Sequence, residues 1–413
     1  MPSDASRDPV RAWADSGIPH LTGRTDGPPL IPPGTAAVRA RELADWIHLA
    51  ADGAVRVDGA ALLGERAAHT GHRRSGVISP GGSGRLLPGA DGWVAVSCAR
   101  PDDPALLGAL AQRTVGDDPW SALEDWVGGH SRAEFDERAR LLGVAGGGVA
   151  AAGDVPAAAQ GALLPRGTPR SVEGMLVVDF SALWAGPLCA HLLGLAGARV
   201  VKVETPQRLD GARRGKADFY RLLHGGHESV VLDPAVPAER AALHRLVEAA
   251  DIVIEASRPR ALRGFGLDSA EFVAGGTTWV SITAAGRGSD RIGFGDDVAA
   301  SAGLVAEDVA GPMFVGDAIA DPLSGLIAAA LAMCETGSAG ALWDVSMRAT
   351  VAATLDDEPA PTARRDGHRW ITHSDYDSGP IELARPTLRL PTSDAPPPGR
   401  DTSAVLAGLG ISR

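Results

Sequence analysis

From Met175 to about Leu355, short runs of β-branched residues alternate with longer stretches rich in alanine and leucine. This alternation is typical of repeated βαβ units, in which helices join parallel strands. It predicts an α/β fold built on a parallel sheet. The expected strands are Met175–Asp179, Arg199–Val203, Ser229–Leu232, Ile252–Glu255 and Trp279–Thr283, with helices after Gly186, Ala238, Pro259 and Pro322.

The rest of the chain follows other patterns. Helix-like segments at Arg39–Leu49 and Arg132–Leu142 flank a strand-like stretch at Trp93–Cys98, which indicates a smaller α+β domain. Composition rich in Gly, Ala and Pro, or in Pro, Asp and Arg, marks linkers and arms. The expected parts are an N-terminal segment (1–35), the small domain (36–150), a linker (151–170), the large domain (171–355) and an extended C-terminal arm (356–413) that carries Trp370 and Tyr376.

The N-terminal part weakly echoes the large domain. Ser16-Gly17, Gly27-Pro28 and Val57-Asp58-Gly59 resemble Ala302-Gly303, Gly311-Pro312 and Trp343-Asp344-Val345, with a predicted helix before the last element of each set. Partial duplication and chance both explain the echo. If the copies are related, aligning Gly27 with Gly311 puts Ala37 opposite Asp321, so that residues 1–35 belong to a remnant without the acid.

Composition excludes several classes of function. The formal net charge of -12 argues against a broad nucleic-acid or anionic-membrane surface, because phosphate binding needs clustered cations. The three cysteines are far apart and form no CxxC pair, which fits a reducing cytoplasm. The longest apolar stretch, Gly325–Cys334, is about half the length that spans a bilayer. We therefore expect a cytoplasmic protein without nucleic-acid or membrane partners.

An acid stands at the mouth of an apolar helix. Asp321 precedes Pro322, a residue suited to the first helical turn. As a structural N-cap, its carboxylate would satisfy backbone N–H groups of that turn. A carboxylate partly withdrawn from water can also attack a thioester carbonyl while helix N–H groups orient it. The two roles are compatible, and spacing alone leaves both open.

Several linked motifs carry a family resemblance. Val177-Val178-Asp179-Phe180-Ser181, Ala185-Gly186-Pro187, Leu195-Ala196-Gly197-Ala198 and Val201-Lys202-Val203-Glu204 closely resemble the opening of family III CoA-transferases, which include formyl-CoA transferases and α-methylacyl-CoA racemases. The similarity covers residues 172–355. Segments 86–96 and 140–144 resemble the family's small domain, in a permuted or fused-and-trimmed order. The resemblance implies a Rossmann-like large domain, a smaller α+β domain and an intertwined homodimer.

The resemblance also implies a reaction. Family members transfer CoA between an acyl-CoA and a free carboxylic acid through an aspartate that forms an acyl anhydride and then an enzyme thioester. Asp321 matches this aspartate. Gly81 and Gly82 match a loop that covers it in some members, although a plain turn of this composition needs no function. The positions that match the family's CoA contacts are Leu183, Trp184, Ala185, Thr205, Ala256, Ser257, Arg258 and Arg263.

These positions depart from the family pattern. Ala256 and Ser257 replace an asparagine-aromatic pair, and Trp184 is bulky where an extended cofactor would pass. Arginine forms bidentate bonds with phosphate oxygens, but a solvated charged face is the alternative explanation for the arginines nearby. Those arginines are Arg208, Arg213, Arg214, Arg258, Arg260 and Arg263.

Coenzyme A, as part of acyl-CoA, is the only cofactor implied. The turn at 184–187 lacks the GxGxxG spacing of nicotinamide and flavin dinucleotide sites, and Asp296 and Asp297 lack the spacing of a hard-cation loop, so no metal is expected.

α-Methylacyl-CoA racemases pair the equivalent aspartate with a histidine, and Phe294 stands at that position here. His224 or His227 would replace it only if folding brought one of them close. A different acyl-substrate reaction and a catalytically degenerate binding subunit remain as alternatives.

Overall fold

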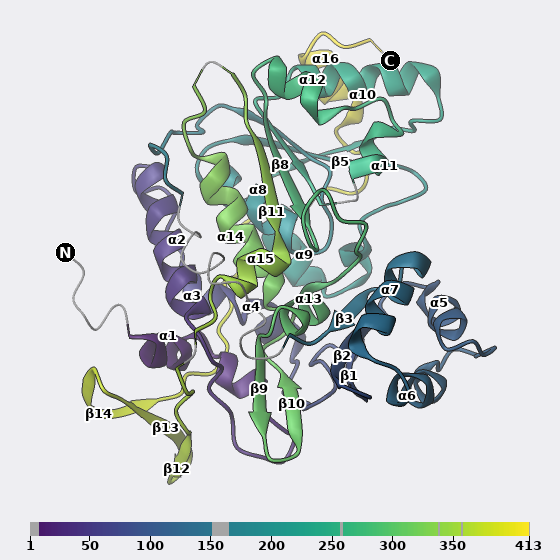
Figure 1. The fold of residues 1–413 in the computed structure, drawn as a ribbon. Helices are drawn as coiled ribbons and strands as arrows, with labels where there is room; N and C mark the ends of the chain where they lie inside the picture. Colours follow the sequence, from purple (N-terminus) through teal and green to yellow (C-terminus); the bar gives the residue numbers. More distant parts are fainter. Residues whose placement is uncertain (1–7, 151–164, 257–258, 338, 357, 413) are drawn as a thin grey trace.

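The computed structural model describes residues 8–150, 165–256, 259–337, 339–356 and 358–412. Its central sheet has the order β11-β8-β7-β4-β5-β6, and every neighbouring pair is parallel (Figure 1). The predicted α/β class and parallel sheet are confirmed, and each of the five predicted strands agrees to within a residue at either end. The strands are β4 (Leu176–Asp179), β5 (Arg199–Glu204), β6 (Glu228–Val231), β7 (Ile252–Glu255), β8 (Thr278–Thr283) and β11 (Leu342–Ser346).

Helices cover both faces of the sheet, because successive strand residues point to opposite faces. Val177 and Ile254 belong to a core shared with α8 (Ala185–Leu195) and α14 (Ala320–Ala332). Val178 lies in a second core on the other face. That face is covered by α10 (Pro237–Glu248), α11 (Pro259–Arg263), α12 (Ser269–Ala274) and α16 (Thr402–Gly408), and Figure 1 shows α10, α12 and α16 gathered together.

The N-terminal helices pack into the first of these cores. Their buried side chains include Trp13 and Leu43, which share the core with Leu326 of α14. Figure 1 shows α2 lying beside α14. The core therefore groups residues 36–70 with the sheet, while the domain boundary at residue 36 stays a prediction. The helices are α1 (Pro9–Ser16), α2 (Ala36–Ala50), α3 (Gly59–Leu62) and α4 (Glu65–Thr70).

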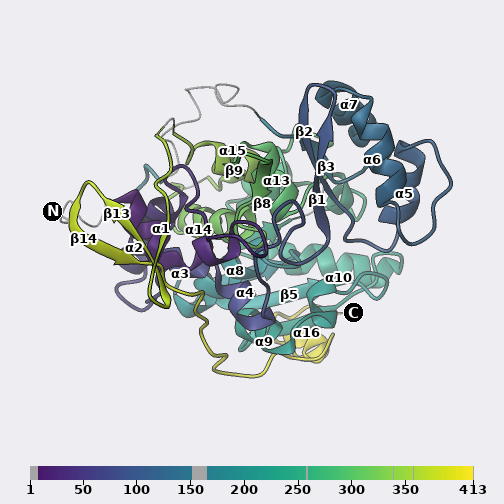
Figure 2. The same ribbon diagram turned by 90° about the horizontal axis from the view of Figure 1, so that it is seen from below.

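A smaller antiparallel sheet has a core of its own, in which Val94, Leu107 and Phe135 are buried. Its strands are β1 (Gly84–Gly89), β2 (Gly92–Ser97) and β3 (Gly146–Gly148), and its helices are α5 (Asp103–Leu110), α6 (Trp120–Gly128) and α7 (Arg132–Leu142). Figure 2 shows these helices on the side of the molecule away from α1. Most of the predicted linker, residues 151–164, lies outside the described residues.

The C-terminal arm lies along its own chain and is not extended throughout. It forms a three-stranded antiparallel sheet of β12 (Arg364–Asp366), β13 (Arg369–Ser374) and β14 (Asp377–Glu382). Beyond this sheet, the Ala384 N–H donates to the Ala14 carbonyl at 2.8 Å, and the Asp401 carboxylate accepts from the Ser229 N–H at 2.8 Å. Trp370 packs against the main core, whereas Tyr376 is exposed.

The echo within the sequence has a counterpart in the fold. Ala37 is the second residue of α2, as Asp321 is the second residue of α14. Gly17 and Gly303, which follow α1 and α13 (Gly295–Ser301), both have left-handed backbones, with φ of 78° and 104°. The last helix of each set, α3 or α15 (Met347–Ala352), is capped by a polar side chain. The duplication itself stays a prediction.

No helix within the described ranges has both the length and the apolar character needed to cross a membrane.

Candidate active site

Asp321 is held at the start of α14 by an unusual turn. The hairpin of β9 (Val305–Asp308) and β10 (Gly311–Phe314) leads into this turn, in which Ala318 has a left-handed backbone with φ 52°. The Ala318 N–H donates to Asp296 Oδ1 at 2.7 Å, which fixes that strained residue. Ile319 occupies the N-cap position, so Asp321 does not take the N-cap role that the spacing left open: it is the second residue of the helix.

Two backbone segments enclose the Asp321 carboxylate. Gly295, the first residue of α13, approaches so closely that a Cβ atom there would collide with Asp321 Oδ2 and lie 2.6 Å from the Ala318 carbonyl oxygen. The Ala185 N–H at the start of α8 donates a hydrogen bond to Asp321. Burial raises the pKa of Asp321 to about 7, with Asp296 adding to the effect and Arg66 opposing it.

Two further carboxylates, Asp296 and Asp317, act on this acid, and a third, Asp297, adjoins Asp296. Burial raises the pKa of Asp296 to about 6, and Asp317 adds to that shift. Burial also raises the pKa of Asp297 to about 7, although the Ser97 hydroxyl donates to it at 2.6 Å. Asp317 behaves differently: Arg66 outweighs its burial and holds its pKa at about 2. The cluster therefore combines carboxyl groups whose pKa is raised toward neutrality with one that stays ionised down to about pH 2.

The cation of the site comes from the N-terminal helices. Arg66 of α4 makes a bidentate ion pair with Asp317, through Nε at 2.9 Å and Nη2 at 2.5 Å. His72 Nδ1 lies 3.2 Å from Asp317 Oδ2. Asp317 has no exposed surface, whereas the side chains of Arg66 and His72 are about a quarter exposed. Sequence reasoning missed both residues, because about 250 positions separate them from Asp317.

The glycine-rich loop lies over this ion pair. A Cβ atom at Gly81 would lie 3.5 Å from His72 Cε1 and 3.7 Å from both Arg66 Nη2 and Asp317 Oδ1. Gly82 has φ of 80°, a backbone conformation that favours glycine. Both glycines are exposed. The loop is thus next to the carboxylate cluster, and its covering role stays a prediction.

Several predicted contact residues gather at the carboxyl edge of the sheet. Leu183, Thr205 and Ala256 follow β4, β5 and β7, and the strand order reverses between β4 and β7. Ligands of open parallel sheets bind at such a switch point. Leu183 is exposed and has φ of 70°, which marks a strained turn at this edge. Arg263, at the end of α11, is also exposed, while Ser257 and Arg258 lie outside the described residues.

Trp184 and Ala185 are buried rather than open to this edge. The Trp184 ring packs edge-on against Phe219, with centroids 5.4 Å apart, and the Arg66 guanidinium lies 5.3 Å from its centroid. Trp184 therefore packs against the Arg66 guanidinium and helps to fix its position. Among the predicted arginines, Arg213 is already held by a bidentate pair with Glu204.

The predicted substitute histidines lie elsewhere. His224 is buried with its Nε2 3.8 Å from Asp210 Oδ2, and His227 lines a different cavity. The histidine that folding brings to the carboxylate cluster is His72.

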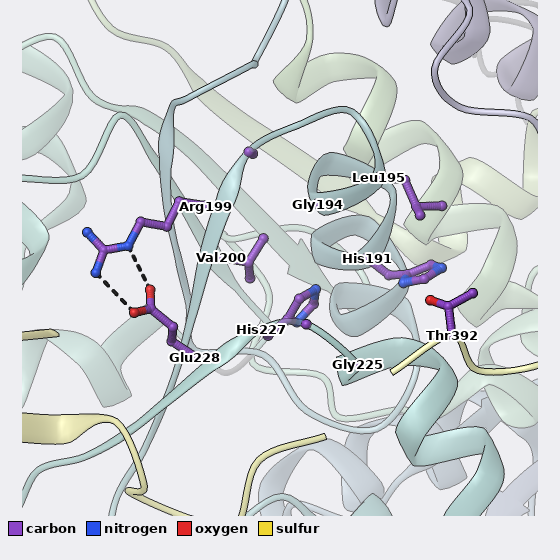
Figure 3. A pocket seen from close by; sticks show the side chains of 11 residues that line it. His191, Gly194, Leu195, Arg199, Val200, Gly225, His227, Glu228 and Thr392 are labelled. Atoms are coloured by element: carbon purple, nitrogen blue, oxygen red, sulfur yellow. Dashed lines mark hydrogen bonds and ion pairs between the residues drawn. The ribbon is translucent and has the colours of Figure 1, made fainter. Parts of the chain in front are cut away.

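A cavity of about 360 Å³ opens at the other end of α8 (Figure 3). His191 and His227 line it together with Thr392, and an ion pair between Arg199 and Glu228 stands at its side, with nitrogen-oxygen distances of 2.7 and 3.1 Å. A helix rises about 1.5 Å per residue, which separates this cavity from the Asp321 end of α8.

Across the described parts of the chain, no group of three or more His, Cys, Asp or Glu side chains is arranged to hold a metal ion.

Comparisons with known proteins agree with the motifs of the large domain. The family model described as CoA-transferase family III matches residues 172–381, about half of the chain. The succinyl-CoA–D-citramalate CoA-transferase of Chloroflexus aurantiacus is 29% identical over 222 residues, which make up 48% of this chain and 54% of that protein. The α-methylacyl-CoA racemase of Homo sapiens is 38% identical over 89 residues, 21% of each chain.

A solved structure from Mycobacterium tuberculosis aligns with a TM-score of 0.43 and 26% identity, over 50% of this chain and 66% of that one. The chain thus spans about half the length of the first curated relative and about a fifth of the second.

Proposed function

The chain belongs to CoA-transferase family III, and from this we propose that it transfers CoA from an acyl-CoA to a carboxylic acid with Asp321 as the nucleophile. The observation that carries the proposal is the placement of Asp321. Gly295 and the Ala185 N–H enclose its carboxylate, and Arg66 lies close enough to influence its charge. A carboxylate removed from bulk water in this way is poorly hydrated and therefore a better nucleophile.

The proposed reaction needs no net proton transfer. An Asp321 oxygen attacks the thioester carbonyl, the carbon-sulfur bond breaks, and CoA thiolate leaves behind an aspartyl-acyl anhydride. The thiolate then attacks the Asp321 carbonyl carbon, which releases the acyl group as a carboxylate and forms an aspartyl-CoA thioester. The acceptor carboxylate displaces CoA from this thioester, and the thiolate finally attacks the new anhydride at the acceptor's carbonyl. New acyl-CoA leaves, and Asp321 is a carboxylate again.

We place the CoA portion along the carboxyl edge of β4, β5 and β7. Exposed Arg208 and Arg214 and the nearby Lys216 follow β5 and supply cations for its phosphates. Leu183 and Ala256 border the same edge. Because Trp184 is buried, its ring is not a direct contact for the cofactor in this arrangement. The intertwined homodimer and the cytoplasmic location stay predictions from the resemblance.

The test of this function is a covalent adduct on Asp321. Wild-type protein is incubated with a panel of acyl-CoAs, with and without hydroxylamine, and analysed by intact-protein and peptide mass spectrometry. We expect an acyl or CoA adduct, or the corresponding hydroxamate, on the peptide that contains Asp321, and none in Asp321→Ala. The donor that labels best identifies the acyl class.

Absence of any adduct, together with no binding of CoA, would exclude the transferase. It would favour the two alternatives, a different acyl-substrate reaction or a catalytically degenerate binding subunit.

A second candidate reaction is exchange of the α-proton of an acyl-CoA, and His72 is the observation that favours it. The structure brings His72 to Asp317, which stands four residues before Asp321 in the chain, although Phe294 holds the position of the racemase histidine. A histidine oriented by a carboxylate is a common general base. The site thus contains a second group able to accept a proton.

Proton exchange is measured by NMR as deuterium incorporation at the α-carbon of an acyl-CoA in D₂O. If His72 is the base, His72→Gln should abolish incorporation while the Asp321 adduct still forms. Incorporation that persists in His72→Gln, or that is absent from the wild type, excludes this role. Replacement of exposed Arg73 by methionine is the matched control.

A further inference from the structure

The Arg66 guanidinium beside Asp321 has one nitrogen, Nη1, that its ion pair with Asp317 does not use. Arg66 uses Nε and Nη2 for Asp317, and no hydrogen bond to a described residue involves Nη1. This atom is also not among the buried polar atoms without a partner, so it reaches solvent. The Arg66 side chain is fixed from two sides, by the Asp317 pair and by the Trp184 ring below it. A rigid guanidinium with a free edge is suited to binding a carboxylate.

The charges around this edge change during the proposed reaction. Asp317, Asp296 and Asp321 all act on Arg66, so its one positive charge is already more than balanced in the resting site. Asp317 is paired, and Asp296 accepts hydrogen bonds from the Ala318 N–H and the Ser79 hydroxyl. Asp321 is the only one of the three that the reaction neutralises, because it carries no charge as an anhydride or as a thioester. A carboxylate near Arg66 is repelled less at that stage than at any other.

We infer that Arg66 Nη1, beneath the Gly81–Gly82 loop, binds the carboxylate of the acid substrate, and that this site takes its ligand after Asp321 has been acylated. The inference rests on the proposed transferase function and adds to it the residue that recognises the acceptor. It also gives the N-terminal helices a role in catalysis. Helix α4 positions Arg66 at the site, so the N-terminal helices contribute a binding residue in addition to packing against α14.

The order of binding follows from the same charges. Free enzyme, with Asp321 ionised, should bind an acid weakly, whereas the aspartyl-CoA form should bind it well. The acid then attacks the Asp321 carbonyl carbon from a position already fixed next to it.

Asp321→Asn imitates the uncharged state without any CoA. Isothermal titration calorimetry with sodium propionate at pH 8.5, where Asp321 of the wild type is ionised, and at constant ionic strength compares it with the wild type. We expect binding to tighten by about tenfold or more, since one like charge has been removed beside the ligand. Asp321→Ala is a second uncharged variant, in case the asparagine protein folds poorly.

A triple variant, Asp321→Asn with Arg66→Met and Asp317→Asn, removes the guanidinium while leaving the net charge of the ion pair unchanged. It should lose the added affinity, and Asp321→Asn with Arg73→Met should keep it, because Arg73 is an exposed arginine next to His72. The inference fails if Asp321→Asn binds no more tightly than the wild type, if the triple variant retains the affinity, or if Arg73→Met removes it.

The outcome is separate from that of the adduct experiment. An adduct on Asp321 without a gain in carboxylate affinity would leave the transferase standing and remove this site. A gain in affinity without an adduct would leave an anion site whose chemistry lies elsewhere.

Discussion

Asp321→Asn is expected to lower the rate of CoA transfer by on the order of 10⁴-fold, since loss of a nucleophile costs this much or more in enzymes that form covalent intermediates. The amide nitrogen of asparagine cannot attack the thioester in place of the carboxylate oxygen that Gly295 and the Ala185 N–H enclose. Turnover is measured by chromatography of the acyl-CoA products, with the donor that labels the wild type best. The matched control is Asp297→Asn, which changes a buried carboxyl group that also has a raised pKa and is held by Ser97.

Stability distinguishes a chemical effect from a folding defect. The pKa of Asp321 is raised from 3.8 to about 7, so the folded state retains a proton that the unfolded state releases between these values. Stability therefore falls as pH rises from about 4 to 7. Asp321→Asn removes this loss, and its thermal unfolding should depend less steeply on pH than that of the wild type.

Two activity results would refute the assignment of Asp321 as the nucleophile. One is an Asp321→Asn variant that retains a tenth of the wild-type activity, and the other is an Asp297→Asn variant as inactive as Asp321→Asn.

The sequence predicts the sheet well because each strand is a local pattern. Ile252–Glu255 is a short apolar run between turn residues, and the strand occupies those same positions. The arm contains a local signal of a hairpin: Gly367, with φ of 60°, is the first residue of a two-residue turn between two strands that pair, and glycine is common at that position of a hairpin turn. The strands of the arm consist mostly of polar residues, so they lack the alternation of apolar and polar residues that predicts strands elsewhere.

The candidate site was predictable only in part. Asp321 and the Gly81–Gly82 loop were found because their motifs are contiguous in the sequence. Arg66 and His72 were not, since their partner Asp317 is more than 240 positions away and no local pattern in residues 65–72 indicates the contact. The burial of Trp184 was also missed, because it depends on Phe219 and Arg66 closing over the ring. Contacts between distant segments decide these features.

The N-terminal helices connect stability to function through one ion pair. Arg66→Met should lower the free energy of unfolding by about 3–5 kcal/mol, the usual cost of leaving one member of a buried pair without its partner. Asp317 has no exposed surface, and among its described partners only His72 remains after the substitution to compensate its charge. Urea denaturation at pH 7.5 measures the loss. Arg73→Met, in an exposed neighbour, is expected to change stability little.

The double variant Arg66→Met with Asp317→Asn separates the charge effect from lost packing. With no buried charge left, it should recover most of the stability that Arg66→Met loses. Acid supplies an independent check. Arg66 holds the pKa of Asp317 at about 2, so the stabilisation by this pair is present above the ordinary value of 3.8 and disappears as pH falls through about 2. In Arg66→Met this pKa rises, and protonation relieves the unpaired charge at a higher pH. The difference in free energy of unfolding between wild type and Arg66→Met should therefore narrow as pH is lowered. A difference that stays constant with pH would mean that Arg66 acts mainly through its contact with Trp184. A double variant no more stable than Arg66→Met would mean the same.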